Sequence, residues 1–363
     1  MIKKLILRDF RNYQNIDISF DSNLNVFFGK NGQGKTNILE AIFFSGMLRS
    51  FRTSQIRDIK KIGSNGFYIG LEISNKDSWT KFIEIEYISS RKLKIDGNSV
   101  FKASDFIKQI KTVVFSPDDI NIILGNAGLR RRFTDMLISV QSTEYLIALN
   151  NYMVALQSRN AVLKSHIPDS KILKAYETIL SKNIFLIIEL RKKYLAALTE
   201  KIREILNGFY GEDYTFDIKY RTQFSANDEA SYLKHFETER KKDMERGFTG
   251  FGPQLDEVEF IYNGKLMKNF ASTGQCRLIS LCLKMAEINM LAENSPDKNG
   301  IIVLVDDVTG ELDATTKKTF TKIINKAEQA FFTFTEPPSD DSFKTASFFS
   351  VSNGVIEKIN KSF

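Results

Sequence analysis

The sequence has few residues of the types that bind metals or form disulfides. Its 363 residues include two cysteines, Cys276 and Cys282, six positions apart without a CxxC spacing, and two histidines, His166 and His235. A zinc site or a disulfide framework needs several such residues at short spacings. The sequence therefore gives no basis for predicting either one.

Long hydrophobic runs are missing as well. The densest ones, residues 184–188 and 301–305, are far shorter than the roughly 20 apolar residues that span a bilayer. The basic N-terminal segment contains no apolar stretch of signal-peptide length. We therefore expect no membrane association and a cytoplasmic location.

The overall composition is typical of a soluble globular protein. Hydrophobic residues make up 42% and charged residues 26%, which excludes a disordered or collagenous chain. The length allows two domains. The sequence has 51 Lys and Arg against 44 Asp and Glu, which gives a net charge of +7. This charge mildly favours an anionic partner such as nucleic acid.

The two ends of the chain are predicted to be rich in strands. Short apolar segments separated by turn residues occur within residues 1–28 and 67–88, and Asp96-Gly97 predicts a hairpin. After about residue 250 the pattern returns to strands and turns. There we expect a hairpin of residues 257–262 and 265–269, a helix over 274–293 and a buried strand over 301–305.

The middle of the chain is predicted to be helical. No Pro or Gly occurs between Pro168 and Gly208, and apolar residues recur at spacings of three and four from Leu173 to Ile205. This predicts one amphipathic helix of about 55 Å, with residues 130–164 as its partner. An ordinary helical lobe and a coiled-coil arm are equally compatible with the pattern.

Together these patterns predict an α/β fold interrupted by an insertion. Residues 1–118 and 250–363 would form one head with a mixed sheet, and residues 119–249 would form an inserted α-helical lobe or short coiled-coil arm.

The clearest motif is a phosphate-binding loop. Residues 29–36, Gly-Lys-Asn-Gly-Gln-Gly-Lys-Thr, match GxxxxGK[ST] and lie between a predicted strand and a predicted helix. The glycines let backbone N–H groups surround a phosphate at a helix N-terminus. Lys35 would reach the β- and γ-phosphates and Thr36 would bind Mg²⁺. A coincidental glycine-rich turn would not require the flanking strand and helix, so we predict ATP and Mg²⁺ binding.

A second motif follows a buried strand. The apolar run 301–305 ends in Asp306 and Asp307, and the carboxyl end of such a strand faces the ligand crevice of an α/β sheet. In a P-loop protein an aspartate at this place serves Mg²⁺, so we assign Asp306 to the metal, through a water. Asp307 would be the catalytic residue that orients or deprotonates the attacking water. A polar turn after a strand is the structural alternative.

The third motif is Ser272-Thr273-Gly274-Gln275, directly before the helix predicted over 274–293. Ser or Thr at this place is also an ordinary helix N-cap. The order of the motifs, ending in residues 310–313, is similar to that of ABC-type ATPases. The similarity implies that Ser272–Gln275 acts in trans on the γ-phosphate of a second head and that Asp313 belongs to the D-loop.

The chain resembles the bacterial RecF recombination mediator family of SMC-like ABC-type ATPases. The resemblance covers nearly the whole length and is carried by residues 10–13, 29–41, 49–53, 115–118, 130–135, 252–253, 272–277 and 306–313. It implies an ATPase head with an inserted helical lobe, acting in DNA replication, repair and the SOS response. It also implies that the nucleotide-binding residues are Arg11, Asn12, Gly29, Lys30, Asn31, Gly32, Gln33, Gly34, Lys35, Thr36 and Asn37.

The resemblance further implies a mechanism and partners. ATP would close a homodimer around duplex DNA near a single-strand gap, slow hydrolysis would release it, and RecR and RecO would take part in loading recombinase. The DNA-contacting residues are open, with Arg52, Arg57, Lys60 and Lys61 as candidates. One departure from the family pattern is Gln254-Leu255, which stands where a basic pair is usual.

Other functions are compatible with parts of the sequence. A degenerate ATP-binding scaffold without turnover is favoured by Gln254-Leu255 and disfavoured by intact Lys35 and Asp307. A transporter ATPase subunit would not need the long helix, and a P-loop kinase would not explain Ser272–Gln275.

Overall fold

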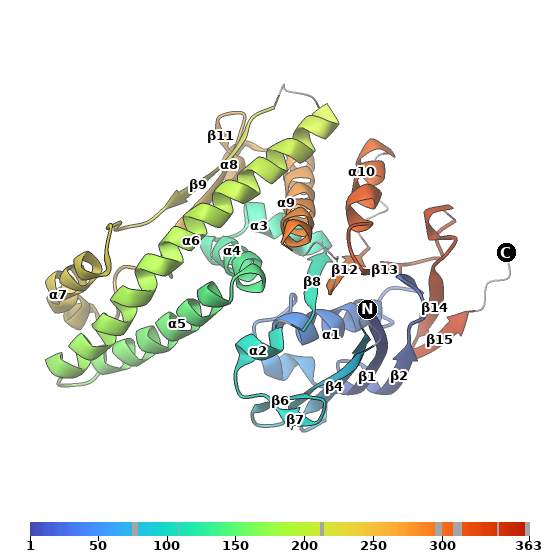
Figure 1. The fold of residues 1–363 in the computed structure, drawn as a ribbon, viewed down its shortest axis with the longest axis horizontal. Helices are drawn as coiled ribbons and strands as arrows, with labels where there is room; N and C mark the ends of the chain where they lie inside the picture. Colours follow the sequence, from blue (N-terminus) through green and yellow to red (C-terminus); the bar gives the residue numbers. More distant parts are fainter. Residues whose placement is uncertain are drawn as a thin grey trace. The chain divides into compact units, whose positions relative to one another are not determined.

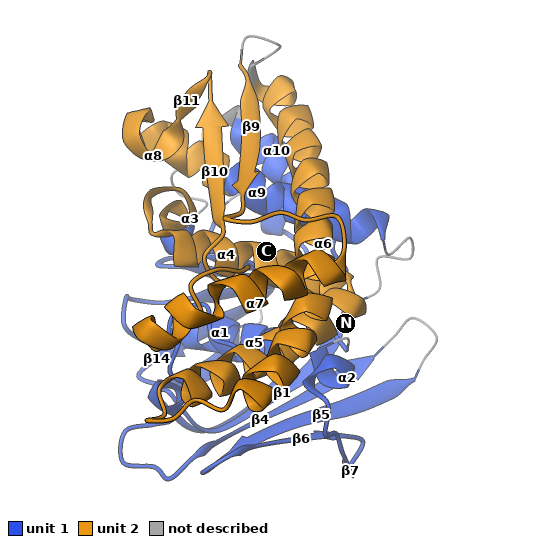
Figure 2. Ribbon diagram, turned by 90° about the vertical axis from the view of Figure 1, so that its left-hand side faces the viewer, with its two compact units in different colours: residues 1–119, 281–363 blue, residues 120–280 orange. Residues whose placement is uncertain are grey.

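The computed structural model describes residues 1–74, 79–107, 109–210, 214–294, 300–307, 314–339 and 341–359. The chain divides into two compact units, unit 1 with residues 1–119 and 281–363, and unit 2 with residues 120–280 (Figures 1 and 2). Within the described ranges, no helix is long and apolar enough to cross a membrane.

Unit 1 contains an antiparallel sheet with the strand order β2-β1-β4-β5-β6-β7. Asp96 and Gly97 take positive φ angles of 49° and 78° between β6 and β7, as the predicted two-residue hairpin requires. The strands are β1 (Ile2–Phe10), β2 (Tyr13–Ser19), β4 (Phe67–Ser74), β5 (Thr80–Tyr87), β6 (Arg91–Ile95) and β7 (Asn98–Ser99).

The second sheet of unit 1 has the order β15-β14-β3-β13-β12-β8, and its strands are parallel except β15. All six residues of β12 are buried, as expected where helices cover both faces. The strands β3, β13 and β12 are parallel neighbours. Their carboxyl ends therefore lie at the same edge of the sheet. The strands are β3 (Leu24–Phe28), β8 (Lys111–Phe115), β12 (Ile301–Asp306), β13 (Gln329–Phe334), β14 (Ser347–Ser352) and β15 (Val355–Ile359).

Helices of unit 1 include α1 (Lys35–Met47), α2 (Ala103–Ile107) and α10 (Ala314–Ile324). The core beside the second sheet is aromatic: the ring of Phe20 meets those of Phe27, Phe331 and Phe349 edge-on, with centroids 5.0–6.3 Å apart. Three of these rings come from the adjacent strands β3, β13 and β14. This packing accounts for several of the 30 phenylalanines of the chain.

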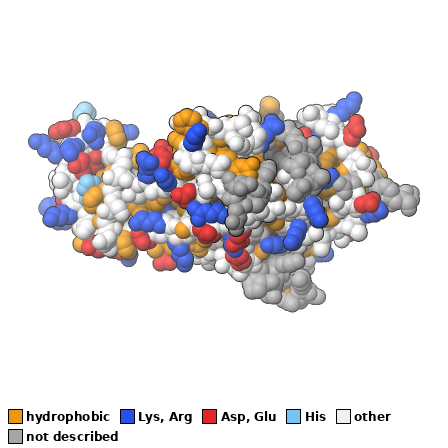
Figure 3. Space-filling view, turned by 90° about the horizontal axis from the view of Figure 1, so that it is seen from above, with side chains coloured by type: hydrophobic (Ala, Val, Ile, Leu, Met, Phe, Trp, Pro, Cys, Tyr) orange, Lys and Arg blue, Asp and Glu red, His pale blue; other side chains and the backbone are white. Residues whose placement is uncertain are grey.

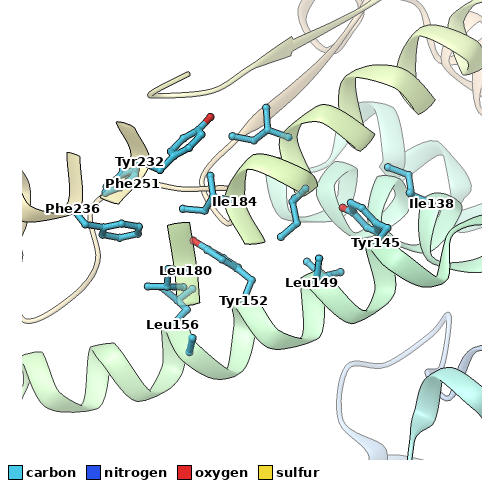
Figure 4. Packing of buried hydrophobic residues seen from close by; sticks show 14 residues of the cluster. Ile138, Tyr145, Leu149, Tyr152, Leu156, Leu180, Ile184, Tyr232, Phe236 and Phe251 are labelled. Carbon is cyan, nitrogen blue, oxygen red and sulfur yellow. The ribbon is translucent and has the colours of Figure 1, made fainter. Parts of the chain in front are cut away.

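Unit 2 is built around α6 (Ser170–Tyr210), which confirms the predicted long helix. Its partner α5 (Thr143–Leu163) packs against it through a cluster of buried apolar residues that includes Tyr152 and Ile184 (Figure 4). The predicted helix over residues 130–164 is two helices, because Ser142 ends α4 (Ala127–Gln141) and caps α5 by accepting a hydrogen bond from the N–H of Tyr145.

The remaining elements of unit 2 differ in part from the sequence-based expectation. A three-stranded sheet, β11-β10-β9, includes a strand, β9, that was not predicted. The strand expected over 265–269 ends at Leu266, because the buried Met267 begins a single helical turn. The elements are α3 (Ile120–Leu124), β9 (Phe216–Arg221), α7 (Glu229–Arg246), β10 (Glu257–Tyr262), β11 (Lys265–Leu266), α8 (Met267–Phe270) and α9 (Thr273–Glu293).

The unit boundaries also differ from those proposed for the head and the lobe. Residues 250–280 group with the helical unit, and α9 spans the boundary at 280/281. The reason is pairing: β10 joins β9 from Glu257↔Arg221 to Tyr262↔Phe216, and β9 follows α6 in the chain. Figure 2 shows these two strands side by side.

A buried ionic network links three parts of unit 2. Arg159 of α5 is fully buried and pairs with Glu177 of α6 at 2.9 Å and with Asp243 of α7 at 2.8 Å. The Thr249 hydroxyl accepts a further hydrogen bond from Nη1 of Arg159 at 2.8 Å. Both carboxylates are buried, so their charges are neutralised by this guanidinium and, for Glu177, by Arg240.

Replacing Arg159 by alanine is expected to lower the free energy of unfolding by about 3–5 kcal/mol, because it leaves two buried carboxylates with less compensation. Urea unfolding followed by circular dichroism measures this change. Lys174→Ala is the control: its pair with Glu237 is exposed, so its loss should cost less than about 1 kcal/mol. Equal losses of unfolding free energy in Arg159→Ala and Lys174→Ala would contradict the prediction that the buried network contributes more than the exposed pair.

Candidate nucleotide-binding site

The loop between β3 and α1 has a backbone that only glycine tolerates at two positions. Gly29 has φ 148°, and a Cβ there would lie 2.3 Å from the carbonyl oxygen of Val351. Gly34 has φ 117°, and a Cβ there would lie 2.6 Å from Nδ2 of Asn12. Both the dihedral angle and the close approach therefore exclude a side chain. The result is a tight loop that leads directly into the N-terminus of α1.

The Lys35 side chain folds back over this loop. Only 6% of the residue is exposed, and its Nζ atom donates to the carbonyl oxygens of Gly29 at 2.6 Å and Lys30 at 2.9 Å. Burial lowers the pKa of Lys35, and the carboxylates of Asp307 and Asp306 oppose this shift. The ammonium is therefore held against the loop, where an anion could take the place of the two carbonyl oxygens.

Asp306 and Thr36 form the polar centre of the sheet edge. The Thr36 hydroxyl donates to Asp306, with Oγ1 2.8 Å from Oδ1 and 3.0 Å from Oδ2, and the Thr333 hydroxyl of β13 donates to Oδ1 at 2.8 Å. Burial raises the pKa of Asp306, while the hydrogen bonds from Thr333 and Thr36 lower it. β3 with α1 supplies the hydroxyl and β12 supplies the carboxylate.

This pair fits a magnesium ion. Mg²⁺ prefers oxygen ligands and usually binds one or two protein groups together with substrate phosphates and water. A hydroxyl and a carboxylate already within 3.0 Å of each other provide such a pair. No group of three His, Cys, Asp or Glu side chains forms a metal cluster in the described part of the chain, so this site would depend on the nucleotide to complete its ligands.

Asp307 lies at a strained turn directly after β12. Its φ angle is 51°, an uncommon conformation for a residue other than glycine. Its backbone N–H donates to the Thr333 hydroxyl at 3.1 Å, and the residue is exposed. The carboxylate is therefore accessible to water and makes no hydrogen bond with another described residue. Residues 308–313, with the predicted Asp313, lie outside the described residues.

A chain of hydrogen bonds joins Asn12, Gln33 and Asn37 beside the loop. Asn12 donates through Nδ2 to the carbonyl oxygen of Gln33 at 3.0 Å and accepts from Nδ2 of Asn37 at 2.7 Å. Gln33 accepts a bond from the N–H of Asn353 at 2.6 Å. The structure thus brings these predicted residues together, while Lys30, Asn31 and Gly32 are exposed at the loop's tip.

Glu40 is a residue of this site that the sequence did not single out. It is fully buried in α1, and Arg11 binds it through Nε at 2.8 Å and Nη2 at 2.6 Å. Arg52 approaches it at 3.3 Å and also donates to Asn37 at 2.7 Å. The available signal was a carboxylate on an otherwise apolar helix. Arg11 and Arg52 are therefore positioned beside the loop by a shared buried acid.

The segment Ser272–Gln275 caps α9 in unit 2. The N–H of Gln275 donates to the Ser272 hydroxyl at 3.2 Å, and Oε1 of Gln275 accepts from the N–H of Ser272 at 2.8 Å, which is a capping box. Ser272, Thr273 and Gly274 are exposed. The helix N-terminus is thus ordered and accessible, as either a cap or a signature segment requires.

The predicted DNA-contacting residues differ in their surroundings. Arg52 is engaged by Glu40 and Asn37, and Lys60 donates to the carbonyl oxygen of Ser64 at 2.9 Å. Arg57 and Lys61 have no ion pair with another described residue. Among the residues that Figure 3 colours by type, Lys and Arg side chains lie between Asp and Glu side chains and form no continuous basic stripe on this face.

Gln254, one of the two residues that depart from the family pattern, has hydrogen-bond partners in unit 2. Gln254 accepts a hydrogen bond from the Tyr152 hydroxyl and donates to the carbonyl oxygen of Phe251 at 2.9 Å. Leu255 is 40% exposed. Asp256 is buried and pairs with Arg191 at 3.1 Å. The glutamine therefore contributes to packing inside the unit.

Comparisons with known proteins all place the chain in one family. The family model for the RecF/RecN/SMC N-terminal domain matches residues 1–355. The DNA replication and repair protein RecF of Clostridium kluyveri is 35% identical over 99% of this chain and 100% of its own length. The protein of the same name from Thermoanaerobacter sp. strain X514 is 34% identical over 98% and 99%, respectively.

Solved structures give the same result. The structure of the recombination mediator protein RecF-ATP in the RecFOR pathway has a TM-score of 0.87 at 28% identity, covering 99% of this chain and 97% of that one. The corresponding RecF-ATPrS structure has a TM-score of 0.86, covering 99% and 98%. An SMC head bound to part of ScpA has a TM-score of 0.53 at 16% identity, covering 100% and 98%, and shows a shared fold.

Proposed function

The chain belongs to the RecF family of DNA replication and repair proteins and has its ABC-type ATPase head fold with an extended helical arm, and from this premise we propose that it is an ATP-dependent DNA-binding switch. The observation that carries the proposal is the P-loop itself. A glycine-restricted turn, the buried Lys35 and the Thr36–Asp306 pair meet at one sheet edge.

ATP is the nucleotide that this site would bind. Lys35 would leave the carbonyl oxygens of Gly29 and Lys30 and contact the β- and γ-phosphates. Thr36 and Asp306 would hold Mg²⁺, which supplies neutralisation of phosphate charge when bound. Solved RecF structures named RecF-ATP and RecF-ATPrS support this choice of ligand.

ATP binding would close a homodimer of two heads. The exposed N-terminus of α9, with Ser272, Thr273, Gly274 and Gln275, would face the γ-phosphate held by the partner, since a helix N-terminus favours anions. Asp307 would orient or deprotonate the attacking water, and Asp313 would serve as the D-loop residue. Hydrolysis would then open the dimer, and slow turnover is sufficient because differential affinity drives the switch.

DNA would be bound by the closed dimer. The printed names of the relatives, which mention DNA repair and the RecFOR pathway, support DNA as the ligand and RecR and RecO as partners. Duplex DNA near single-strand gaps as the substrate and recombinase loading as the outcome follow from the family resemblance. The net charge of +7 is consistent with this polyanion. Arg57, Lys60 and Lys61 remain candidates for the contacts, whereas Arg52 already has partners in Glu40 and Asn37.

Multi-angle light scattering of the purified protein tests the switch. We expect a monomer without nucleotide, a dimer with ATP, and a larger complex with ATP and gapped duplex DNA. A dimer with ATP but no phosphate release would instead favour an ATP-binding scaffold. A monomer under all three conditions would refute the proposal.

Asp307→Asn is expected to bind ATP, lose hydrolysis and accumulate as an ATP-bound dimer. Asparagine keeps the side-chain shape but cannot accept the proton of water, so turnover should fall by roughly 10²–10⁴-fold. Phosphate release and light scattering measure the two effects. Asp306→Asn is the comparison variant. It removes the carboxylate that would hold Mg²⁺, so it should weaken the binding of Mg²⁺ rather than the handling of the attacking water. An unchanged turnover number in Asp307→Asn would remove Asp307 from the reaction.

A further inference from the structure

The C-terminal end of α1 brings two arginines together. Leu48, the C-cap residue, has φ 51°, and its carbonyl oxygen accepts a hydrogen bond from Nη1 of Arg91 at 3.0 Å. Arg91 is the first residue of β6, and Arg49 directly follows Leu48 in the chain. The bond therefore fixes one guanidinium beside the residue that carries the other.

The two positive charges are not compensated by a carboxylate. Neither Arg49 nor Arg91 forms an ion pair with any residue that the structure describes. Both arginines are exposed, but partial desolvation of the Arg91 guanidinium lowers its pKa, and the positive charge of Arg49 lowers it further. Like charges held next to each other are unfavourable, so an anion bound between them would be stabilised by both.

More basic residues lie at the same end of unit 1. Thr53, four residues after Arg49, donates to the carboxylate of Asp58 at 2.9 Å. The N–H of Arg11 donates to the carbonyl oxygen of Ile59 at 2.8 Å, so the segment that carries Arg57 lies beside the end of β1. Arg57 is exposed, and Lys61 is partly exposed. The N–H of Lys61 donates to the carbonyl oxygen of Asp9 in β1 at 2.7 Å. The backbone of Gly66 lies against Tyr87, which pairs with Arg91 across β5 and β6. Several cations thus share one end of the antiparallel sheet.

We propose that Arg49 and Arg91 form a clamp for a phosphate of the DNA backbone, within the basic end that includes Arg57 and Lys61. Arginine presents planar donors that suit phosphate oxygens, and phosphodiester contacts position a duplex without reading its sequence. Capping of α1 accounts for the Leu48 contact of Arg91, but it leaves Arg49 without a structural role. The clamp rests on the DNA binding proposed above.

Fluorescence anisotropy with a labelled duplex, ATP and a series of salt concentrations tests the clamp. For the parent protein, the logarithm of the binding constant should fall linearly with the logarithm of the salt concentration. Arg49→Gln should reduce that slope by about 1, and the double variant Arg49→Gln/Arg91→Gln should reduce it by about 2. ATP binding should be unchanged in both variants, since neither residue contacts the P-loop in the described structure.

The matched control is the double variant Lys92→Gln/Lys94→Gln on the same strand. These lysines face Glu86 and Glu84 across β5 and β6, so they are partly neutralised and should leave the slope nearly unchanged. A slope that is unaffected in Arg49→Gln, or reduced equally in the lysine control, would overturn the clamp.

Two further outcomes are separable from these. If Arg91→Gln lowers the melting temperature but not the salt slope, Arg91 only caps α1, and the two-arginine clamp is wrong. If the parent protein binds no duplex with ATP, the proposed function fails, and the clamp fails with it. Arg49→Gln should melt like the parent, because Arg49 makes no hydrogen bond with another described residue.

Discussion

Replacing Lys35 by alanine is expected to abolish tight ATP binding. The ammonium is the main positive charge at the loop, is only 6% exposed, and would contact two phosphates. Hydrogen bonds to charged groups contribute about 1.5–3 kcal/mol each, so the loss should be at least about 3 kcal/mol, or roughly 100-fold in Kd. Isothermal titration with ATP and Mg²⁺ measures it directly.

Lys30→Ala is the matched control for this experiment. Lys30 lies in the same loop and carries the same charge, but it is exposed, and only its backbone carbonyl oxygen is used, by Lys35. Its replacement should change ATP affinity little. Equal affinities of Lys35→Ala and the parent, with both proteins folded by circular dichroism, would contradict the assignment of the P-loop.

The P-loop could be predicted from sequence because its determinants are contiguous. A strand, a glycine-rich turn and a helix follow one another within residues 24–47, and the positive φ angles of Gly29 and Gly34 are local backbone properties. The Asp306 pairing was also accessible, since parallel strands that end in polar residues place them at one sheet edge. The first case is a contiguous motif, and in the second the parallel strands bring together residues that are 270 positions apart.

The acid that positions Arg11 and Arg52 could not be predicted in the same way. Glu40 lies 29 residues from Arg11 in the sequence, and a charged residue in a helix is most often solvent-exposed. The same holds for Arg159 and Asp243, which are 84 residues apart. Such pairs depend on tertiary packing. The basic end with Arg49 and Arg91 likewise required the hydrogen bond between Arg91 and Leu48 to be seen.

The pairing of β10 with β9 shows a further limit of sequence patterns. Residues 250–280 read as strands and turns, which favoured their assignment to the strand-rich head. Their partner strand lies within the helical segment, where β9 is short and mostly not buried. Because a strand's partner is not encoded in its own residues, the pattern indicated the element type but not its unit.

Replacing Ser272 by arginine is expected to block ATP-induced dimerisation while preserving ATP binding by the monomer. Ser272 is exposed, and its described hydrogen bonds are with Gln275 and Cys276 of the same helix, whereas the P-loop residues make theirs within unit 1. A bulky cation would cover the helix N-terminus that would meet the partner's γ-phosphate. Light scattering with ATP measures dimerisation, and titration measures nucleotide affinity.

Ser272→Thr separates the loss of the helix cap from the steric effect. Threonine keeps the capping hydroxyl, so this variant should be as stable as the parent to within a few tenths of a kcal/mol and should dimerise. The arginine variant also loses the cap, at a cost of about 1 kcal/mol, which is too small to unfold the chain. Normal dimerisation of Ser272→Arg with ATP would mean that the segment is only a helix cap.

Mixing two defective chains tests whether the nucleotide is shared between heads. A Ser272→Arg chain retains Lys35, and a Lys35→Ala chain retains Ser272, so a heterodimer contains one composite site with both elements intact. That site should restore a dimer signal and ATP hydrolysis above the level of either variant alone. If each chain used only its own Lys35 and Ser272, no combination could restore activity, because each chain would remain defective by itself. Restoration therefore requires a site built from two chains.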